Sequence, residues 1–236
     1  MQAIILAGGK GTRLKPYTTI LPKPLMPIAE YPILEIIIKQ LAHFGVKDIT
    51  LAVGHLKELI QAFFNDGKRW EVKISYSMEE VPLGTAAPLR LLNNLEDDFL
   101  VMNGDILTNL NFRKFLEYHL SNQAYCTIAT YRKPVKVDLG VVKTDDHNIL
   151  YDYIEKPTLD YQVSMGVYAF KKEVLEYIPL NQYLDFPSLI HILLQNKKKV
   201  AGYPFEGHWL DIGRPDDYST AVDIYEKNKS EFLWES

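Results

Sequence analysis

Short apolar segments alternate with amphipathic segments along the first half of the chain. The apolar segments are rich in aliphatic side chains and predict buried β-strands at residues 2–7, 48–53, 72–77, 99–102 and 125–130. Between them, apolar residues recur at intervals of three and four, which predicts helices at residues 33–44, 55–64, 85–93 and 111–120. Gly45 directly follows the first of these helical segments and is typical of a helix end.

This order of elements predicts an α/β fold. Strand–helix–strand units place successive strands parallel, through right-handed crossovers. Strands that are buried on both faces appear as continuous apolar runs, and AIILA (residues 3–7) and FLVM (residues 99–102) are such runs. We therefore expect a Rossmann-like three-layer α/β/α arrangement around a mostly parallel central sheet.

The pattern changes after residue 131. Short strand-like segments and turns alternate there, with strands predicted at residues 139–144, 149–154, 163–170 and 199–203. Helices are predicted at residues 171–177, 187–196 and 215–229. Because no repeat, low-complexity tract or linker interrupts the chain, the simplest organisation is one domain, residues 1–236, with halves 1–130 and 131–236.

Composition narrows the function classes. A net charge of −4 argues against bulk electrostatic attraction to nucleic acid or to anionic lipid. No segment reaches the roughly 18–20 apolar residues of a transmembrane helix, and the N-terminus lacks the basic region and cleavage site of a signal peptide. The single cysteine, Cys126, excludes an intramolecular disulfide. We expect a cytoplasmic protein with neither nucleic acid nor membrane as a partner.

A glycine-rich loop, LAGGKGTRL, follows the first strand directly. Its glycines allow positive φ angles, so that backbone amides can turn toward phosphate oxygens. Arg13 adds a guanidinium group, and Lys23 adds a second cation on a backbone stiffened by Pro22 and Pro24. The loop matches neither G-x-x-x-x-G-K-[ST] nor G-x-G-x-x-G. It therefore predicts a triphosphate site of a different type.

Two carboxylates are candidates for a metal site. Asp105 closes the fourth predicted strand of the first half, and ligands of α/β sheets collect beyond the carboxyl ends of strands. Asp211 lies far downstream in the segment WLDIG. Two carboxylates together with phosphate oxygens suit Mg²⁺, which prefers oxygen ligands and keeps several waters.

The N-terminal segment resembles a family signature, LAGGxGTRLxPxTxxxPKPLxPI, that of the sugar-1-phosphate nucleotidyltransferases. Residues 6–28 carry every fixed position of that signature, and the resemblance extends over nearly the entire chain. It implies the nucleotide-diphospho-sugar transferase fold, with a smaller β portion for the sugar. It also implies transfer of a nucleoside monophosphate from a nucleoside triphosphate to a sugar 1-phosphate, giving a nucleotide sugar and pyrophosphate for glycan or cell-surface polysaccharide synthesis.

The resemblance assigns roles to the first half of the chain. Arg13, Lys23 and Asp105 are the expected catalytic residues, and Asp105 and Asp211 the expected Mg²⁺ ligands. The nucleotide is expected to contact Leu6, Ala7, Gly8, Gly9, Gly11, Thr12, Arg13, Lys23, Gly84 and Thr85.

Sugar-phosphate binding is assigned to the second half. The family's G-V-V and E-K-P segments line its sugar site, and here they supply Gly140, Glu155 and Lys156. Glu155 can accept hydrogen bonds from sugar hydroxyls, and Lys156 can pair with the sugar phosphate. The next segment supplies Ser164 and Gly166. Similar enzymes often have Asn at the position of Ser164, so the identity of the sugar stays open.

The segment EVPLGTAAPL, residues 80–89, resembles a stretch of the mannose-1-phosphate guanylyltransferases. It departs from that stretch by the extra Val81 and by Ala87 in place of Gly. The likeness favours GTP as the donor, while Ala87 keeps the choice of base open. Mannose 1-phosphate or a heptose 1-phosphate is the favoured acceptor. UTP, dTTP or CTP, or a non-catalytic regulatory homologue, are the alternatives. A homo-oligomer is compatible with the sequence, and we expect no C-terminal β-helix domain.

Overall fold

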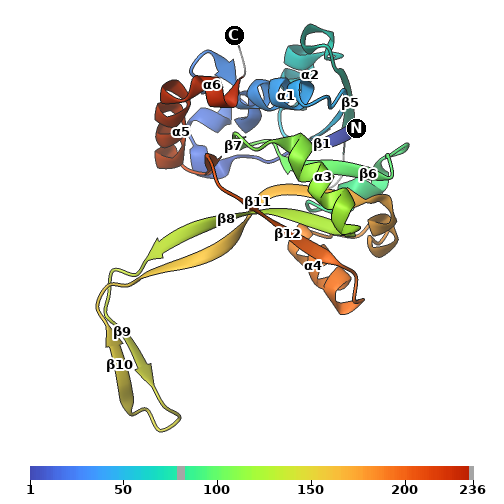
Figure 1. Cartoon of the computed structure of the whole chain (residues 1–236). Helices are drawn as coiled ribbons and strands as arrows, with labels where there is room; N and C mark the ends of the chain where they lie inside the picture. The colour runs from blue at the N-terminus through green and yellow to red at the C-terminus, as the bar shows by residue number, and fades with distance from the viewer. Residues whose placement is uncertain (79–82, 234–236) are drawn as a thin grey trace.

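Seven strands form one central sheet, in the order β12-β8-β11-β6-β1-β4-β5 (Figure 1). This computed structural model describes residues 1–78 and 83–233. β1 (Gln2–Ala7) lies at the centre of the first half, parallel to β4 (Asp48–Val53) on one side and to β6 (Asp98–Asn103) on the other. β5 (Lys73–Met78) extends the sheet beyond β4, again in parallel. The parallel arrangement predicted from the sequence is confirmed for this half.

Three later strands complete the same sheet. β11 (Thr158–Lys171) is antiparallel to both β6 and β8 (Cys126–Lys136), whereas β12 (Val200–Phe205) is parallel to β8. The sheet is therefore mostly parallel, with one antiparallel strand, β11, between β6 and β8.

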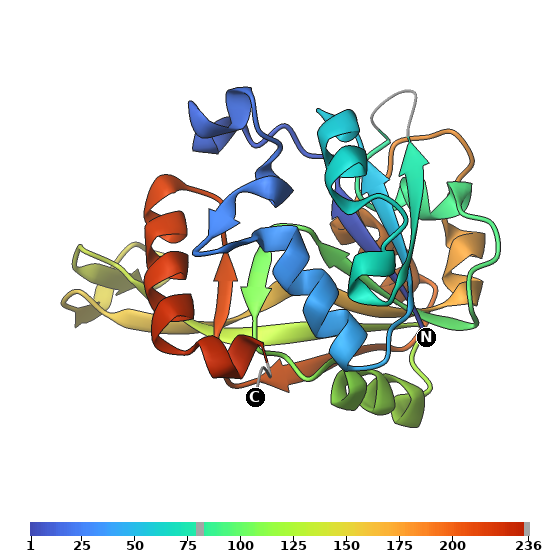
Figure 2. The ribbon, with the colours of Figure 1, turned by 90° about the horizontal axis from the view of Figure 1, so that it is seen from above.

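Helices cover both faces of the sheet. One core cluster joins Ile5 and Leu51 of the sheet to helices α1 (Ile33–His43), α2 (Lys57–Phe64), α3 (Phe112–Asn122), α5 (Pro215–Lys227) and α6 (Lys229–Phe232). A second cluster joins Ile4 and Val101 to α4 (Phe186–Gln195) on the opposite face. Seen from above in Figure 2, α1, α2 and α5 lie on the viewer's side of the sheet. The three-layer α/β/α fold is confirmed.

Two predicted helices are shorter and of a different type. The segment predicted as a helix at 85–93 contains only a 3₁₀ segment, η5 (Ala87–Leu91). Its first amides, those of Ala86 and Ala87, donate to the carbonyl of Leu184 in a distant loop, and Pro88 has no amide hydrogen to donate. The segment predicted at 171–177 is also a 3₁₀ turn, η6 (Lys172–Tyr177).

Several short elements lie outside the central sheet. β2 (Pro27–Ile28) pairs with β3 (Tyr31–Pro32), and β7 (Ile106–Thr108) pairs antiparallel with β13 (Trp209–Asp211). Four further 3₁₀ turns are η1 (Thr12–Leu14), η2 (Tyr17–Thr19), η3 (Lys23–Leu25) and η4 (Lys68–Trp70). Across residues 1–78 and 83–233, we find no helix with the length and hydrophobicity needed to span a membrane.

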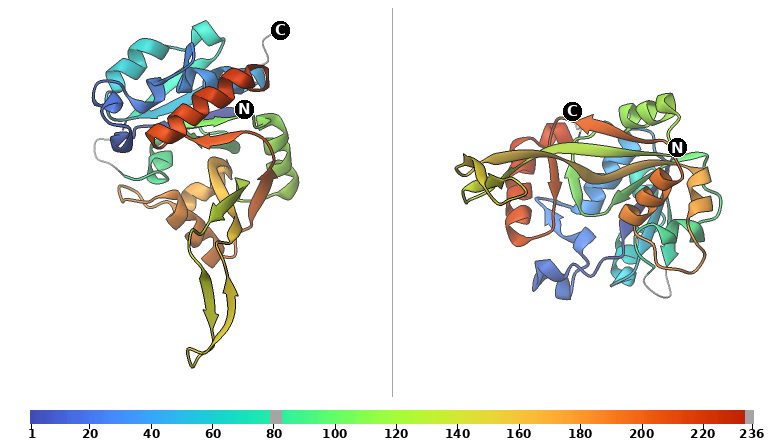
Figure 3. Two further views of the ribbon diagram at one scale, coloured as in Figure 1. Left: turned by 90° about the vertical axis from the view of Figure 1, so that its left-hand side faces the viewer. Right: turned by 90° about the horizontal axis from the view of Figure 1, so that it is seen from below.

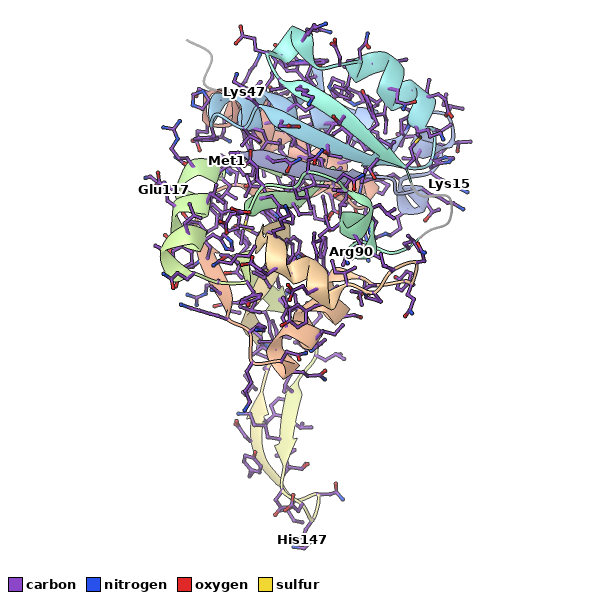
Figure 4. All side chains as sticks on the ribbon, turned by 90° about the vertical axis from the view of Figure 1, so that its right-hand side faces the viewer. Met1, Lys15, Lys47, Arg90, Glu117 and His147 are labelled. Carbon is purple, nitrogen blue, oxygen red and sulfur yellow. The ribbon has the colours of Figure 1, made fainter. Side chains whose placement is uncertain are left out.

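A long β-arm projects from the body of the molecule (Figures 1 and 3). β8 and β11 continue beyond the sheet as a two-stranded ribbon, which leads into a hairpin of β9 (Val141–Thr144) and β10 (Leu150–Ile154). We refer to residues 131–163 as the arm. Figure 4 shows His147 at its far end. The sequence predicted both hairpin strands but not their projection, because it placed the end of β8 at residue 130.

Candidate active site

A cavity of about 650 Å³ opens beyond the carboxyl ends of β1, β4 and β6. Ligands of open α/β sheets bind at this edge. The cavity is lined by Leu6, Ala7, Gly8, Gly9, Lys10, Lys23, Pro24, Ala52, Val53, Gly54, His55, Lys57, Met78, Gly84, Thr85, Asn103, Gly104, Asp105 and Tyr183. The glycine-rich loop and the predicted metal carboxylate Asp105 therefore face one space.

The backbone of the glycine-rich loop is held tightly on one side and open on the other. A Cβ atom on Gly54 would lie 2.9 Å from the carbonyl oxygen of Gly8, so the two chain segments pass each other without side chains. Gly9, in contrast, has no heavy atom within 4 Å of a built Cβ position. An open backbone beside a cavity is what a phosphate group needs in order to approach the amides.

Gly11 turns the chain out of the loop. Its φ of 59° is left-handed, and the Thr18 hydroxyl donates to its carbonyl at 2.7 Å. Gly11, Thr12 and Arg13 lie beside the cavity without lining it, and Arg13 is exposed. The structure therefore brings most of the predicted nucleotide residues to the cavity wall and leaves these three outside it.

Lys23 contacts Asp105 inside the cavity. The Nζ atom of Lys23 forms an ion pair with Oδ2 of Asp105, and both side chains are largely enclosed. Lys23 starts η3 directly after Pro22, which has extended geometry. The sequence predicted both residues as functional but did not predict that they pair.

The two predicted metal carboxylates are neighbours. The β7–β13 ladder sets Asp211 opposite Ile106, and the amide of Ile212 donates to the carbonyl of Asp105 at 3.1 Å. Oδ1 of Asp105 is buried without a hydrogen-bond partner. Partial burial and the negative charge of Asp105 raise the pKa of Asp211, while Lys23 and Arg13 oppose that rise.

This donor set fits a divalent cation such as Mg²⁺. A buried carboxylate oxygen without a partner and a second carboxylate whose ionisation is disfavoured would both gain from a cation between them. Mg²⁺ is typically held by one or two carboxylates, with water and phosphate oxygens completing its shell. Within the described ranges, 1–78 and 83–233, no cluster of three or more His, Cys, Asp or Glu residues offers a fuller protein cage.

Two loops build the wall of the cavity around Gly84. The amide of Leu184 donates to the carbonyl of Leu83 at 2.8 Å, and the amide of Phe186 donates to the Thr85 hydroxyl at 3.0 Å. Gly84 has a φ of 92°, and a Cβ atom there would lie 2.5 Å from the Leu184 carbonyl oxygen. Of the segment compared with guanylyltransferases, residues 80–82 lie outside the described residues.

Ser164 and Gly166 lie where β11 enters the sheet. Ser164 donates to the Tyr168 hydroxyl oxygen at 3.1 Å and accepts from the Gly166 amide at 3.3 Å. A Cβ atom on Gly166 would lie 2.6 Å from Nδ2 of Asn103, which lines the cavity. These two predicted sugar residues therefore adjoin the cavity wall.

The other three predicted sugar residues, Gly140, Glu155 and Lys156, lie in the arm and do not line the cavity. Thr158 and Ser164 are six positions apart in β11, which corresponds to about 20 Å of strand. Glu155 and Lys156 are exposed, and Glu155 accepts a hydrogen bond from the Tyr153 hydroxyl at 2.9 Å. Gly140 is packed so closely on that Tyr153 ring that a Cβ would overlap it.

Several side chains that line the cavity were not predicted as site residues, among them His55, Lys57, Met78 and Tyr183. The first two follow the carboxyl end of β4, and Met78 ends β5, so their positions after predicted strands were an available signal. The sequence analysis of the helix at 55–64 gave His55 no role. No sequence signal places Tyr183 beside Gly84, because that contact depends on the loop before α4.

Residues 2–228 match the sequence profile of the nucleotidyl transferase family. The chain is 34% identical to a UTP–glucose-1-phosphate uridylyltransferase of Synechocystis sp. over 94% of this chain and 62% of that protein. It is 32% identical to a mannose-1-phosphate guanylyltransferase of Mycobacterium tuberculosis, over 92% of this chain and 62% of that protein. The chain thus spans less than two thirds of the length of these two relatives.

Solved structures share the fold. A putative glucose-1-phosphate thymidylyltransferase from Bacillus anthracis superimposes with a TM-score of 0.76 at 23% identity, over 95% of this chain and 94% of that one. HddC from Yersinia pseudotuberculosis, complexed with GMP-PN, superimposes with a TM-score of 0.71 at 25% identity, over 95% of this chain and 99% of that one.

Proposed function

This chain belongs to the nucleotidyl transferase family, among the sugar-1-phosphate nucleotidyltransferases, and we propose that it joins a nucleoside triphosphate to a sugar 1-phosphate. The observation that carries the proposal is the shared cavity of the glycine-rich loop, Lys23 and Asp105, with Asp211 next to Asp105. A phosphate-binding backbone and a two-carboxylate metal site in one place match a triphosphate substrate.

The reaction needs no protein nucleophile. An anionic oxygen of the sugar phosphate attacks the α-phosphorus in line, a new P–O bond forms, and the bond to the β-phosphate oxygen breaks. Pyrophosphate then leaves with that electron pair. The work of the protein is to position the two substrates and to stabilise their negative charge.

The glycine-rich loop, the two cations and the two carboxylates each have a place in this scheme. The amides around Gly8 and Gly9 hold the triphosphate, Lys23 neutralises charge near the reacting phosphate, and Arg13 approaches from the rim. Mg²⁺, held by Asp105 and Asp211, supplies further neutralisation when it is bound. Lys23 also fixes the orientation of Asp105 through their ion pair.

GTP is the proposed donor. The support is the likeness of residues 80–89 to guanylyltransferases, the guanylyltransferase of M. tuberculosis at 32% identity, and HddC with GMP-PN at 25% identity. UTP is the second candidate donor, because the Synechocystis relative is named as a uridylyltransferase that uses UTP. Mannose 1-phosphate or a heptose 1-phosphate is the proposed acceptor, and the nucleotide sugar would serve glycan synthesis.

The experiment is a substrate matrix. Pyrophosphate release is measured with Mg²⁺ for GTP, UTP, dTTP and CTP, each against mannose, glucose and heptose 1-phosphates. We expect release only when both substrates are present, fastest with GTP. If pyrophosphate release is fastest with UTP, UTP replaces GTP as the donor. If no combination releases pyrophosphate, the catalytic proposal is wrong and a regulatory nucleotide-sugar binder takes its place.

A further inference from the structure

The arm exposes an unusual amount of apolar surface. Of the twenty large apolar side chains exposed among the described residues, ten belong to the arm. The most exposed are Leu139 at 74%, Tyr151 at 69%, Ile149 at 64% and Tyr153 at 58%. Because half-exposed side chains of this size each leave roughly 80–120 Å² uncovered, the arm presents on the order of 800 Å² of apolar-residue surface.

Most of the basic residues of the arm are paired with its acidic residues. Lys143 and Asp152 bridge β9 and β10 at 2.8 Å, and Arg132 and Asp160 bridge β8 and β11 at 2.5 Å. Over residues 131–163, five Lys and Arg residues face six Asp and Glu residues. An arm of nearly zero net charge has no Coulomb attraction to an anionic lipid or nucleic acid, and two such arms do not repel each other.

The hairpin at the end of the arm needs a partner on physical grounds. An isolated two-stranded hairpin is marginally stable in water, and stability comes from further strands or from packing against another surface. β9 and β10 pair only with each other among the described strands, so both of their outer edges are unpaired.

We propose that the arm is the interface to a second copy of this chain and that it carries Lys156 to the active site of that copy. The exposed apolar area matches the roughly 800 Å² that each partner contributes to a standard interface. The near-neutral charge suits self-association, and a two-fold dimer uses the same surface on both copies.

The reach of the arm supports the second part of the proposal, which rests on the proposed function. The part of β8 in the arm, residues 131–136, and the four residues of β9 amount to roughly 33 Å of strand, about twice the radius of gyration, ~18 Å, expected for a chain of this length. Within one chain, about 20 Å of strand separates the Glu155–Lys156 corner from Ser164. In the proposed dimer, the arm of one copy reaches the cavity of the other, where Lys156 supplies a cation for the sugar phosphate.

The first test is sedimentation of the full chain over a concentration series. We expect a dimer, and a monomer after replacement of Val142 and Tyr151 by Thr, which removes apolar area but keeps strand propensity. Tyr153 is left intact because it packs on Gly140. The matched control is Leu120→Gln with Leu194→Gln, which removes apolar side chains of 48% and 53% exposure outside the arm and should leave the dimer intact.

Three results would overturn the interface. A wild-type monomer shows that the arm binds no second copy, and co-sedimentation of that monomer with phospholipid vesicles would assign the surface to lipid. If the wild type is a monomer and a protease cuts its arm more slowly than it cuts the arm of the Thr variant, the arm folds back on its own body. A dimer that survives the Thr substitutions would place the interface elsewhere.

The second test uses a heterodimer with differently tagged subunits, one carrying Asp105→Asn and the other Lys156→Ala. Each variant alone should be nearly inactive. If Lys156 acts on the partner's site, one of the two sites is complete and the heterodimer has about half the wild-type activity. An inactive heterodimer, or an active Lys156→Ala homodimer, contradicts the proposal. Sedimentation needs no turnover, so an inactive wild-type dimer refutes the proposed function and leaves the interface standing.

Discussion

Asp105 has a buried oxygen without a hydrogen-bond partner, and its other oxygen is bound to Lys23. A buried unsatisfied polar group costs about 1–3 kcal/mol, more if it is charged. Beside it, Asp211 has a raised pKa because of partial burial and the charge of Asp105. The two carboxylates thus destabilise the metal-free protein locally, and a bound cation would offset that cost.

The first prediction concerns Asp211 and pH. Because its pKa is raised in the folded state, the folded protein holds this proton more tightly than the unfolded chain does. The stability of the metal-free protein therefore falls as pH rises from the ordinary carboxyl range through the raised pKa, and is constant above it. The Asp211→Asn variant does not show this loss of stability, because its side-chain amide does not ionise.

The measurement is thermal unfolding in the presence of a chelator. At pH 7, Asp211→Asn should have a higher Tm than the wild type, and the difference should shrink as pH falls. Asp146→Asn, in the turn of the arm, is the control and should leave Tm unchanged. A lower Tm for Asp211→Asn at pH 7 would show that Asp211 stabilises the metal-free fold and would contradict the account.

The second prediction concerns Asp105 in catalysis. Asp105→Asn keeps the size of the side chain but removes the charge that holds the cation and pairs with Lys23. We expect kcat to fall by at least about 10²-fold, as when one transition-state-stabilising group is lost. The check is steady-state pyrophosphate release together with circular dichroism. Normal turnover by a folded Asp105→Asn protein would remove Asp105 from the reaction.

At the scale of elements, two loops that meet at Gly84 form one wall of the cavity. Residues 184–186 form hydrogen bonds with Leu83, Thr85, Ala86 and Ala87. The wall therefore depends on contacts between two segments that lie about a hundred residues apart in the sequence. The segment predicted as a helix at 85–93 starts at this wall, where the amides of Ala86 and Ala87 donate to the Leu184 carbonyl, and it forms only the 3₁₀ segment η5. Local sequence patterns contain no information about such a partner.

The third prediction tests this wall. Gly84→Ala places a Cβ 2.5 Å from the Leu184 carbonyl oxygen at a φ of 92°, so the two loops must separate. We expect the KM for the nucleoside triphosphate to rise about tenfold, with a smaller change for the sugar phosphate. Gly202→Ala in β12 is the matched control, because its nearest neighbour would lie 3.8 Å away. Equal KM changes for both substrates would contradict a nucleotide-side wall.

The strands of the first half were predictable for a physical reason. β1 and β4 are buried on both faces, so burial alone makes them continuous apolar runs with sharp polar ends, and their predicted bounds match the structure. The length of β8 was not predictable in this way, because its second part, beyond Ala129, lies largely outside the core, where side-chain polarity no longer follows burial.

At the scale of the whole molecule, the predicted site residues are divided between a compact body and a projecting arm. Asp105 and most of the glycine-rich loop line the cavity, and they were predictable because they follow the ends of predicted strands. Gly140, Glu155 and Lys156 were placed in the same site because of the family resemblance, and the structure puts them in the arm. In the proposed dimer, the position of the arm depends on two chains, and the sequence pattern of one chain carries no information about it.

The central claim is that this cavity joins a nucleotide to a sugar 1-phosphate. Mass spectrometry of the products from GTP, mannose 1-phosphate and Mg²⁺ tests it most directly, with heptose 1-phosphate and UTP run in parallel. We predict a nucleotide sugar and pyrophosphate in equal amounts in at least one reaction, and neither product with Asp105→Asn. Pyrophosphate or phosphate without any nucleotide sugar, or no product in any reaction, would contradict the account.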